Sequence, residues 1–230
     1  MIGIIGAVEE EVRSLQECMT QKSEENYCSM KFCRGKLYGK SVVVVMSGIG
    51  KVNMAVCAQI LLGRYNVDVL INTGIAGSLD PEINIGDIVV GTDAVEHDMD
   101  ASSLGDPVGQ VPRMDVMAFP CSERLADLAV EANKRVNPDI RAFKGRVLSG
   151  DQFISDSAKK DYLVENFKGL CCEMEGAAMA HTAYLNGVEC LILRAISDKA
   201  DGSAHMDYGE FSKMAIEHTM RLILEMIPEI

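Results

Sequence analysis

Short apolar runs without alternation recur along the chain, and segments with helical spacing separate most of them. Residues 42–45 are four consecutive valines, and such a run suits a strand that is covered on both faces of a sheet. Strands are predicted at residues 2–5, 31–37, 42–47, 68–72, 86–95, 142–148, 170–174 and 190–196. Helices are predicted at residues 8–19, 52–65, 123–136, 157–166, 175–186 and 208–226. This alternation predicts an α/β layered fold around a largely parallel sheet, which the early hairpin at residues 31–47 makes mixed.

The sequence predicts a single domain over residues 1–230. A chain of 230 residues buries roughly 70% of its extended-chain surface, and no linker, composition break or internal repeat divides it. Residues 97–120 have no clear periodicity and are rich in Gly, Pro, Asp and Ser. A loop of this length in a compact domain is expected to have a function or to form an interface.

The chain is strongly acidic, since 22 Lys and Arg against 34 Asp and Glu give a formal net charge of −12. A protein that binds nucleic acid needs a basic surface, and an anionic membrane repels an acidic protein, so we expect neither partner. The longest apolar run, residues 1–8, is shorter than the ~18 residues of a membrane span and lacks the basic flank of a signal peptide. The eight cysteines show no CxxC spacing, which indicates reduced core thiols and a cytoplasmic protein.

Polar residues and glycines follow several predicted strands directly. In open α/β sheets a ligand binds outside the carboxyl ends of the strands, so these positions are candidates for a site. They are residues 6–11, 47–51, 72–78, 172–176 and 194–198. Carboxylates and an arginine from these segments can converge at one edge of the sheet. Paired carboxylates with separated pKa values are suited to acid–base cleavage of a glycosidic bond.

Each of these charged residues also has a structural explanation. The three glutamates at 9–11 complement a helix dipole in a first turn, and spacing alone does not single out one of them. One of Glu173 and Glu175 can cap the following helix while the other is solvated, and Asp198 can be a helix N-cap. Arg194 lies in a predicted central strand and therefore needs a partner.

The glycine and histidine patterns predict neither a nucleotide-phosphate loop nor a metal site. Residues 48–51 lack the GxxxxGK[ST] spacing, and residues 74–77 lack GxGxxG. The histidines have no i,i+4 pairing, and the HDMD segment at 97–100 is at most a faint metal pattern. We therefore expect no metal.

Six segments occur in an order that resembles a known family. They are GIIGAVEEE (3–11), SGIGKV (47–52), NTGIAG (72–77), SGDQFI (149–154), EME (173–175) and RAISD (194–198). Together they span nearly the whole chain, and they resemble the 5′-methylthioadenosine/S-adenosylhomocysteine nucleosidases of the nucleoside phosphorylase superfamily. The resemblance implies a three-layer α/β/α fold with a central mixed, largely parallel sheet, a homodimer, and catalysis without a cofactor.

The resemblance also implies a reaction, the hydrolysis of the N-glycosidic bond of 5′-thio-substituted adenosines through an oxocarbenium-like transition state. Asp198 is then the general acid that protonates N7 of adenine, and Glu11 polarises the attacking water, with Arg194 near that water. Glu175 accepts hydrogen bonds from the ribose hydroxyls, and Met174 packs against the sugar.

The remaining roles that the resemblance implies surround the substrate. Phe153 stacks on the purine, and the backbone of Ile154 reads its edge. Ser197 orients Asp198, and Tyr208, where the family often has Phe, closes over the ribose and the 5′ group. The further substrate-binding positions are Ala7, Ile49, Ile75, Cys172 and Glu173.

Two positions depart from the family pattern. Ile75 stands where the family commonly has Ser, and the loss of that hydroxyl removes a phosphate ligand, which favours water as the nucleophile. Leu104 stands where the family often presents Phe to the 5′ pocket of the partner subunit, to which Pro112 also contributes. Two other functions remain open on this fold: a purine nucleoside phosphorylase that uses phosphate, and a non-catalytic nucleoside-binding protein.

Overall fold

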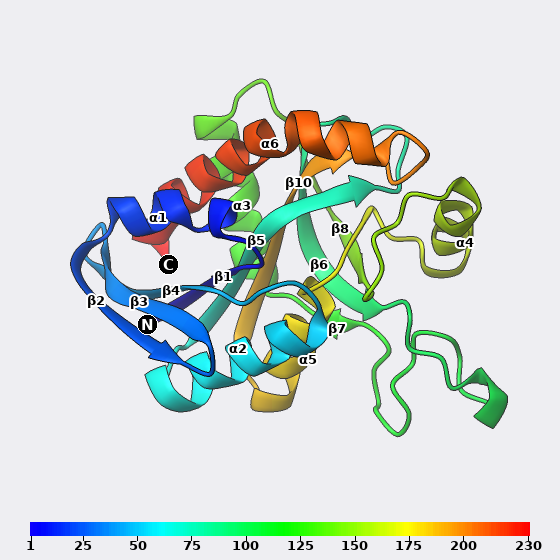
Figure 1. Ribbon diagram of the computed structural model, residues 1–230, viewed down its shortest axis with the longest axis horizontal. Coiled ribbons are helices and arrows are strands. Elements are labelled where there is room, and N and C mark those ends of the chain that lie inside the picture. Colours follow the sequence, from blue (N-terminus) through cyan, green and yellow to red (C-terminus); the bar gives the residue numbers. More distant parts are fainter.

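The computed structural model describes the backbone of residues 1–230 and all side chains except those of His205, Met206 and Tyr208 (Figure 1). The strands are β1 (Ile2–Gly6), β2 (Thr20–Tyr27), β3 (Met30–Leu37), β4 (Lys40–Met46), β5 (Val69–Ser78), β6 (Ile88–Glu96), β7 (Phe119–Pro120), β8 (Ala142–Ser149), β9 (Cys171–Glu173) and β10 (Glu189–Asp198). The helices are α1 (Arg13–Cys18), α2 (Lys51–Tyr65), α3 (Glu123–Val136), α4 (Ser157–Phe167), α5 (Gly176–Asn186) and α6 (Ala204–Met226). The short 3-10 helices are η1 (Glu9–Glu11), η2 (Ser102–Leu104) and η3 (Ile227–Glu229).

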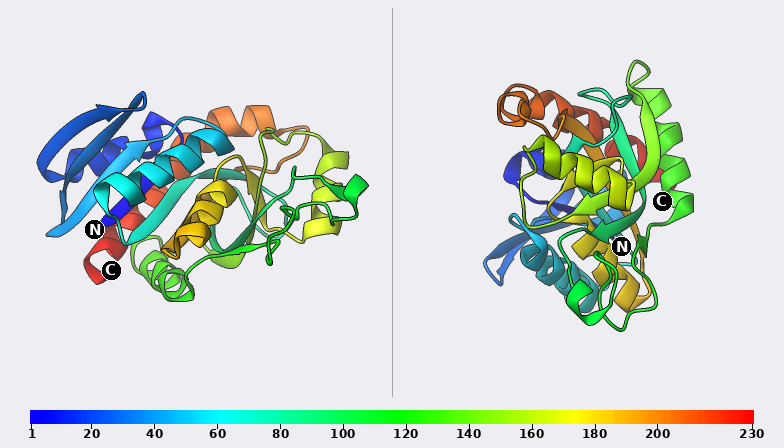
Figure 2. Two further views of the ribbon diagram at one scale, coloured as in Figure 1. Left: turned by 90° about the horizontal axis from the view of Figure 1, so that it is seen from below. Right: turned by 90° about the vertical axis from the view of Figure 1, so that its right-hand side faces the viewer.

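Helices cover both faces of a mixed sheet, so the predicted three-layer α/β/α fold is confirmed (Figures 1 and 2). Helices α2 and α5 pack on one face, and α1, α3 and α6 pack on the other. Parallel pairings join β4, β1, β5 and β10 at the centre of the sheet. Antiparallel pairings add β3 and β2 at one edge.

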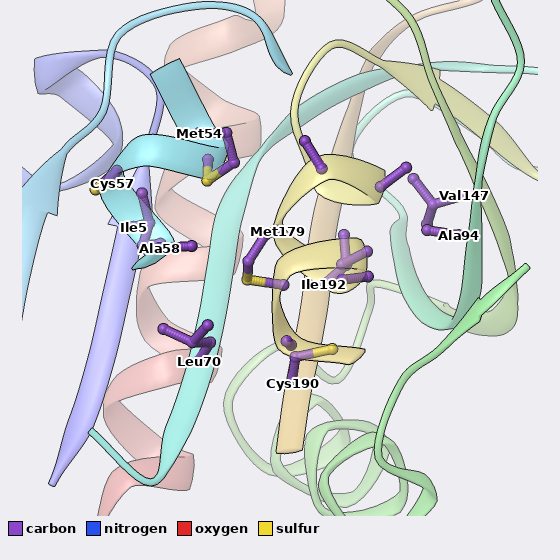
Figure 3. Packing of buried hydrophobic residues seen from close by; sticks show 14 of the residues in the cluster. Ile5, Met54, Cys57, Ala58, Leu70, Ala94, Val147, Met179, Cys190 and Ile192 are labelled. Carbon is purple, nitrogen blue, oxygen red and sulfur yellow. The ribbon is translucent and has the colours of Figure 1, made fainter. Parts of the chain in front are cut away.

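Alternate residues of the central strands point to opposite faces of the sheet, and this produces two hydrophobic cores. Ile5 of β1 belongs to the same core as Met54 of α2 and Met179 of α5 (Figure 3). Its neighbour Ile4 belongs to the other core, together with Leu15 of α1. Because both faces are covered, apolar residues stand at consecutive positions of these strands, as at residues 42–45 of β4 and 69–71 of β5, which explains the runs without alternation in the sequence.

Strand β5 is the centre of the topology because it pairs with three other strands. It is parallel to β1 and β10 and antiparallel to β9. Strand β10 pairs with β6, β6 with β8, and β8 with β9, so these strands close a ring. The ring brings the carboxyl ends of β5 and β10 together, and the end of β1 lies beside them.

Several element boundaries differ from the predicted ones. Strands β5 and β10 run on to Ser78 and Asp198, so the segments 72–78 and 194–198 belong to strand ends instead of to loops after them. The predicted strands ended too early because Asn, Thr and Gly are typical of turns. In the structure, pairing between β5 and β10 keeps these residues in the extended conformation. Helix α6 begins at Ala204, before the predicted start at residue 208.

The N-terminal region departs most from the predicted pattern. The predicted helix at residues 8–19 is divided into η1 and α1 by Val12, whose φ and ψ are −124° and −19°. Strand β2 was not predicted, because all its residues are exposed and its sequence carries no apolar pattern. The long segment at residues 97–120 contains η2 and the short strand β7. None of the helices in the described chain combines the length and apolar composition that a membrane span needs.

Candidate active site

A pocket of about 330 Å³ opens at the carboxyl ends of β1, β5 and β10. The predicted site residues that line it are Ala7, Glu11, Ile49, Ile75, Phe153, Cys172, Glu173, Met174, Glu175, Ser197 and Asp198. Val8, Ala76 and Gly77 also line the pocket and were not predicted. These three residues could have been predicted, because they lie next to predicted site residues in the motifs at 3–11 and 72–77.

A smaller cavity of about 30 Å³ adjoins the pocket at one end. It is lined by Phe153, Ile154 and Asp198, together with Gln152, and Glu11 is not part of its lining. The predicted site residue Ile154 therefore lines this smaller cavity and not the larger pocket. The two cavities together place Asp198 beside the aromatic side chain and Glu11 in the larger space.

Glu11 is the buried member of three consecutive glutamates. It is 5% exposed, whereas residues 9–10 are exposed. Its Oε2 accepts the backbone N–H of Ala7 at 2.6 Å and that of Val8 at 3.2 Å, because η1 is a tight turn that folds the side chain back onto the end of β1. Burial raises the pKa of Glu11, against the charge of Arg194 and the backbone N–H groups, which favour the ionised form. The structure therefore singles out the glutamate that spacing left open.

Arg194 lies beneath the pocket and does not line it. Its Nε donates to Oε2 of Glu173 at 3.2 Å, and its Nη2 donates to Glu173 and to Oδ1 of Asn72. Burial opposes the ionisation of Glu173, but the charge of Arg194 and the hydroxyl of Ser149 outweigh it and lower the pKa of Glu173. The partner that Arg194 needs in its central strand is therefore Glu173.

Gly74 is the position where Glu11 and Arg194 both approach the backbone of β5. A Cβ atom on Gly74 would lie 2.7 Å from Oε1 of Glu11 and 3.4 Å from Nη1 of Arg194. The first distance is too short for any side chain, so the close approach requires glycine here.

Glu175 precedes α5 without capping it. The carboxylate of Glu173 accepts the N–H of Glu175 at 2.9 Å and the N–H of Gly176 at 2.8 Å, and so caps the helix. The carboxylate of Glu175 accepts the N–H of Gly50 at 2.8 Å. Burial and the negative charge of Glu173 raise the pKa of Glu175 to about 7. Capping therefore belongs to Glu173, and the structural alternative in which the other carboxylate is solvated does not hold, because both are buried.

Asp198 ends β10 at the junction of the two cavities. Its Oδ1 accepts the N–H of Ala200 at 2.8 Å, and its Oδ2 accepts the hydroxyl of Ser197 at 2.8 Å. Burial raises the pKa of Asp198, although both of these hydrogen bonds favour the charged form. The alternative of a helix N-cap was wrong, since that position of α6 belongs to Ser203.

Besides Arg194, two predicted site residues with described side chains, Leu104 and Pro112, line neither cavity. Leu104 is 82% exposed on η2, and Pro112 is half-buried in the segment that follows η2. The side chain of Tyr208 lies outside the described residues. Among the side chains that are described, no group of three or more His, Cys, Asp or Glu is placed to hold a metal ion.

Comparisons with known proteins give a consistent result. The family model described as "Phosphorylase superfamily" matches residues 1–228. A 5′-methylthioadenosine/S-adenosylhomocysteine nucleosidase from Staphylococcus carnosus is 38% identical over 228 residues, which are 99% of each chain. The crystal structure of the Neisseria meningitidis enzyme of the same name, in complex with methylthio-immucillin-A, superposes with a TM-score of 0.95 at 32% identity and covers 100% of this chain and 99% of that one. The Colwellia psychrerythraea enzyme of that name, in complex with adenine, has a TM-score of 0.95 at 33% identity, with 99% and 94% covered.

Proposed function

This chain belongs to the phosphorylase superfamily, and from that premise we propose that it hydrolyses the N-glycosidic bond of 5′-methylthioadenosine and S-adenosylhomocysteine. The products are adenine and the 5-thio-substituted ribose. The similar proteins that carry the nucleosidase name match over nearly their whole length, and two of them hold methylthio-immucillin-A or adenine. The protein is an enzyme that acts on N-glycosyl bonds.

One observation carries the proposal: four carboxyl groups share a pocket whose described lining contains no Lys, Arg or His. The four belong to Glu11, Glu173, Glu175 and Asp198. A ribosyl group that loses its base develops positive charge, and carboxylates stabilise that charge in a water-poor site. Those of the carboxyl groups that are ionised repel a phosphate anion, so the pocket favours water as the nucleophile over phosphate.

The leaving group is adenine, which departs more readily when N7 is protonated. Asp198 is the proposed general acid, because burial favours its protonated form and the smaller cavity places it beside Phe153. In the ionised state its Oδ2 accepts the hydroxyl of Ser197. When Asp198 is protonated, the Ser197 hydroxyl has another acceptor in the carbonyl of Ala76 at 3.4 Å. Ser197 can therefore serve both protonation states.

The water and the ribose occupy the larger part of the pocket in this proposal. Glu11 orients and polarises the attacking water, and its fixed bonds to the backbone of Ala7 and Val8 hold the carboxylate in place. Glu175 accepts hydrogen bonds from the ribose hydroxyls, and Met174 packs against the sugar. Hydrogen bonds from those hydroxyls favour the ionised carboxylate and oppose the effect of burial on its pKa.

Arg194 acts through the carboxylates in this arrangement. Its guanidinium is bound to Glu173 beneath the pocket, and its charge favours the ionised form of Glu11, which is the form that attracts a proton from water. We assign Arg194 a positioning and electrostatic role on this basis.

We also propose that the enzyme is a cytoplasmic homodimer that pairs through the face formed by α2 and α5. Val52 and Leu185 are 74% and 68% exposed on these helices, and Val56 is exposed as well. A hydrogen bond between Gln59 and Asn186 joins the two helices beside these side chains. Large exposed apolar groups on adjoining helices are typical of an interface. Light scattering should give twice the monomer mass, and V52E/L185E should give monomers; a monomeric wild type would contradict the dimer.

The dimer gives the exposed loop at residues 97–120 a role. Leu104 and Pro112 lie outside the pocket of their own chain, and we propose that they reach the 5′ end of the pocket in the partner subunit. Leu104→Ala should then raise KM for a nucleoside with a large 5′ group more than for one with a small group.

The reaction is tested by incubating the protein with 5′-methylthioadenosine, with and without phosphate, and identifying both products. Adenine and methylthioribose, formed equally in both conditions, are the expected result. Methylthioribose 1-phosphate formed only with phosphate would make the protein a phosphorylase. Binding without cleavage of any 5′-substituted adenosine would make it a nucleoside-binding protein.

A further inference from the structure

A charged cluster beside the pocket involves none of the predicted site residues. Lys51 is the first residue of α2, and its Nζ donates to Oδ1 of Asp98 at 2.6 Å and to Oε2 of Glu96 at 3.2 Å. The other oxygen of Glu96 is 2.9 Å from Nδ1 of His181 on α5. The side chains of Lys51 and Asp98 are each only 17% exposed, so the pair is largely withdrawn from water.

The bond between Lys51 and Asp98 and two further bonds form a closed ring between segments that are distant in the sequence. Nζ of Lys51 binds Oδ1 of Asp98, and Oδ2 of Asp98 accepts the backbone N–H of Asp151 at 2.9 Å. Oδ1 of Asp151 accepts the backbone N–H of Lys51 at 2.9 Å, which completes the ring. We call these three residues the Lys51 clamp. The clamp ties the start of α2 to the loop after β8.

The backbone next to the clamp contacts the site directly. Gly50, which precedes Lys51, donates its N–H to Oε1 of Glu175 at 2.8 Å. Gly50 has a φ of +96°, and a Cβ atom there would lie 3.1 Å from Oδ1 of Asp151. Asp151 of the clamp therefore lies close to Gly50, the residue whose N–H binds Glu175.

Lys51 and Asp98 favour their charged forms in this cluster. Burial opposes the charge of Lys51, but its hydrogen bond to Asp98 and the nearby charge of Glu96 outweigh burial and raise the pKa of Lys51. Burial likewise opposes the ionisation of Asp98, and the bonds from Lys51 and from the N–H of Asp151 lower the pKa of Asp98 below its ordinary value. Charge-assisted hydrogen bonds of this kind are stronger than neutral ones.

We propose that the Lys51 clamp positions Glu175 for the ribose by holding the N–H of Gly50 against its carboxylate. This inference rests on the proposed function, in which Glu175 binds the ribose hydroxyls. Lys51, Asp98 and Asp151 are positioning residues, since they touch Glu175 only through the backbone of Gly50. An interaction with the ribose that is equally strong in the ground state and the transition state affects KM more than kcat.

The test compares Lys51→Met with two other variants. Lys51→Arg keeps a charge that can bind Asp98, and Lys144→Met removes an ion pair of the same length but greater exposure, Nζ to Oδ1 of Asp127 at 2.6 Å, from another part of the fold. For Lys51→Met we expect KM for 5′-methylthioadenosine to rise about tenfold with a smaller change in kcat. Lys51→Arg should restore most of the loss, and Lys144→Met should match the wild type. Equal KM values for Lys51→Met and Lys144→Met would overturn the clamp.

Two further measurements separate the clamp from general destabilisation. In a double-mutant cycle with Glu175→Ala, the loss in kcat/KM caused by Lys51→Met should shrink, because Glu175→Ala removes the acceptor of the Gly50 N–H on which Lys51→Met acts. Full additivity of the two losses would overturn the proposal. If Lys51→Met does not fold, Asp98→Asn weakens the same ring and replaces it in the cycle.

Amide hydrogen exchange tests the clamp without turnover. Exchange at Gly50 should be faster in Lys51→Met than in Lys144→Met, because the bond to Glu175 is weakened. Equal exchange in the two variants would overturn the clamp. A wild type that hydrolyses neither nucleoside would refute the proposed function, and the exchange comparison would still decide whether the clamp holds Gly50.

Discussion

Arg194 and Glu173 form an ion pair in which the side chains are only 2% and 3% exposed. The pair connects two parts of the site, since Glu173 lines the pocket and also caps α5 in front of Glu175. Each charge was removed from water during folding, so each depends on the other. The base of the pocket is therefore held by electrostatics and not only by apolar packing.

Arg194→Met should destabilise the fold strongly, because it leaves Glu173 buried without its countercharge. Breaking a buried pair from one side costs about 3–5 kcal/mol. The free energy of unfolding in urea measures the effect. Arg124→Met is the matched control, since it removes an exposed pair with Glu189 and should cost no more than about 1 kcal/mol. Equal losses in the two variants would contradict the importance of the buried pair.

Asp198→Asn should stop the release of adenine while the fold remains intact. The amide keeps the size of the side chain and an oxygen for the N–H of Ala200, but it has no proton to give to N7. The rate should fall by about 10²–10⁴-fold, the usual contribution of general acid catalysis. Initial rates of adenine formation and the melting temperature check both parts. A variant that melts far below the wild type would show that Asp198 has a structural role.

Stability should fall as pH rises through the titration of Glu175. Its pKa in the folded protein is about 7, against 4.5 for the ordinary side chain, so the folded state holds this proton more tightly than the unfolded state. The resulting stabilisation is complete below pH 4.5 and is lost as pH rises to about 7. Glu175→Gln should lose less stability over that range than the wild type, as measured by urea unfolding at several pH values. Glu165→Gln, at an exposed position, should follow the wild type; a parallel course of Glu175→Gln would contradict the raised pKa.

Gly74→Ala should impair activity by displacing Glu11. The new Cβ would lie 2.7 Å from Oε1 of Glu11, so either the carboxylate or the strand must shift. We expect at least a tenfold loss in kcat/KM, roughly what a misplaced catalytic group costs. Gly63→Ala on α2 is the control, because its nearest neighbour would be 3.9 Å away and alanine favours a helix by about 0.5–1 kcal/mol. Comparable activity in the two variants would contradict the steric argument.

The sequence was sufficient for the parts of the fold that depend on local pattern. The valine run at 42–45 predicts a strand covered on both faces, and that strand pairs at the centre of the sheet. The motifs at strand ends also predict most of the pocket lining, because parallel strands align their carboxyl ends. The exposed strand β2 had no such signal, since its eight residues face solvent and its strand conformation depends on pairing with β3.

Contacts between residues that are distant in the sequence could not be predicted from local sequence patterns. Arg194 does not line the pocket, because Glu173 and Asn72 bind it from two other strands. The closure of the strands into a ring depends on the pairing of β9 with β5, which involves only Gly77 and Ser78 of β5. The sequence contains each of these residues but gives no indication of their distances.

The pairing of β5 has a consequence for synthesis on the ribosome. The edge that β10 covers is rich in Val, Leu and Ile, yet β10 comprises residues 189–198, long after β5 in the sequence. A nascent chain that has formed β1, β4 and β5 therefore presents an open, apolar strand edge until residues 189–198 have emerged. Such an edge can pair with other chains, so we expect the growing polypeptide to require a chaperone more than the finished protein does.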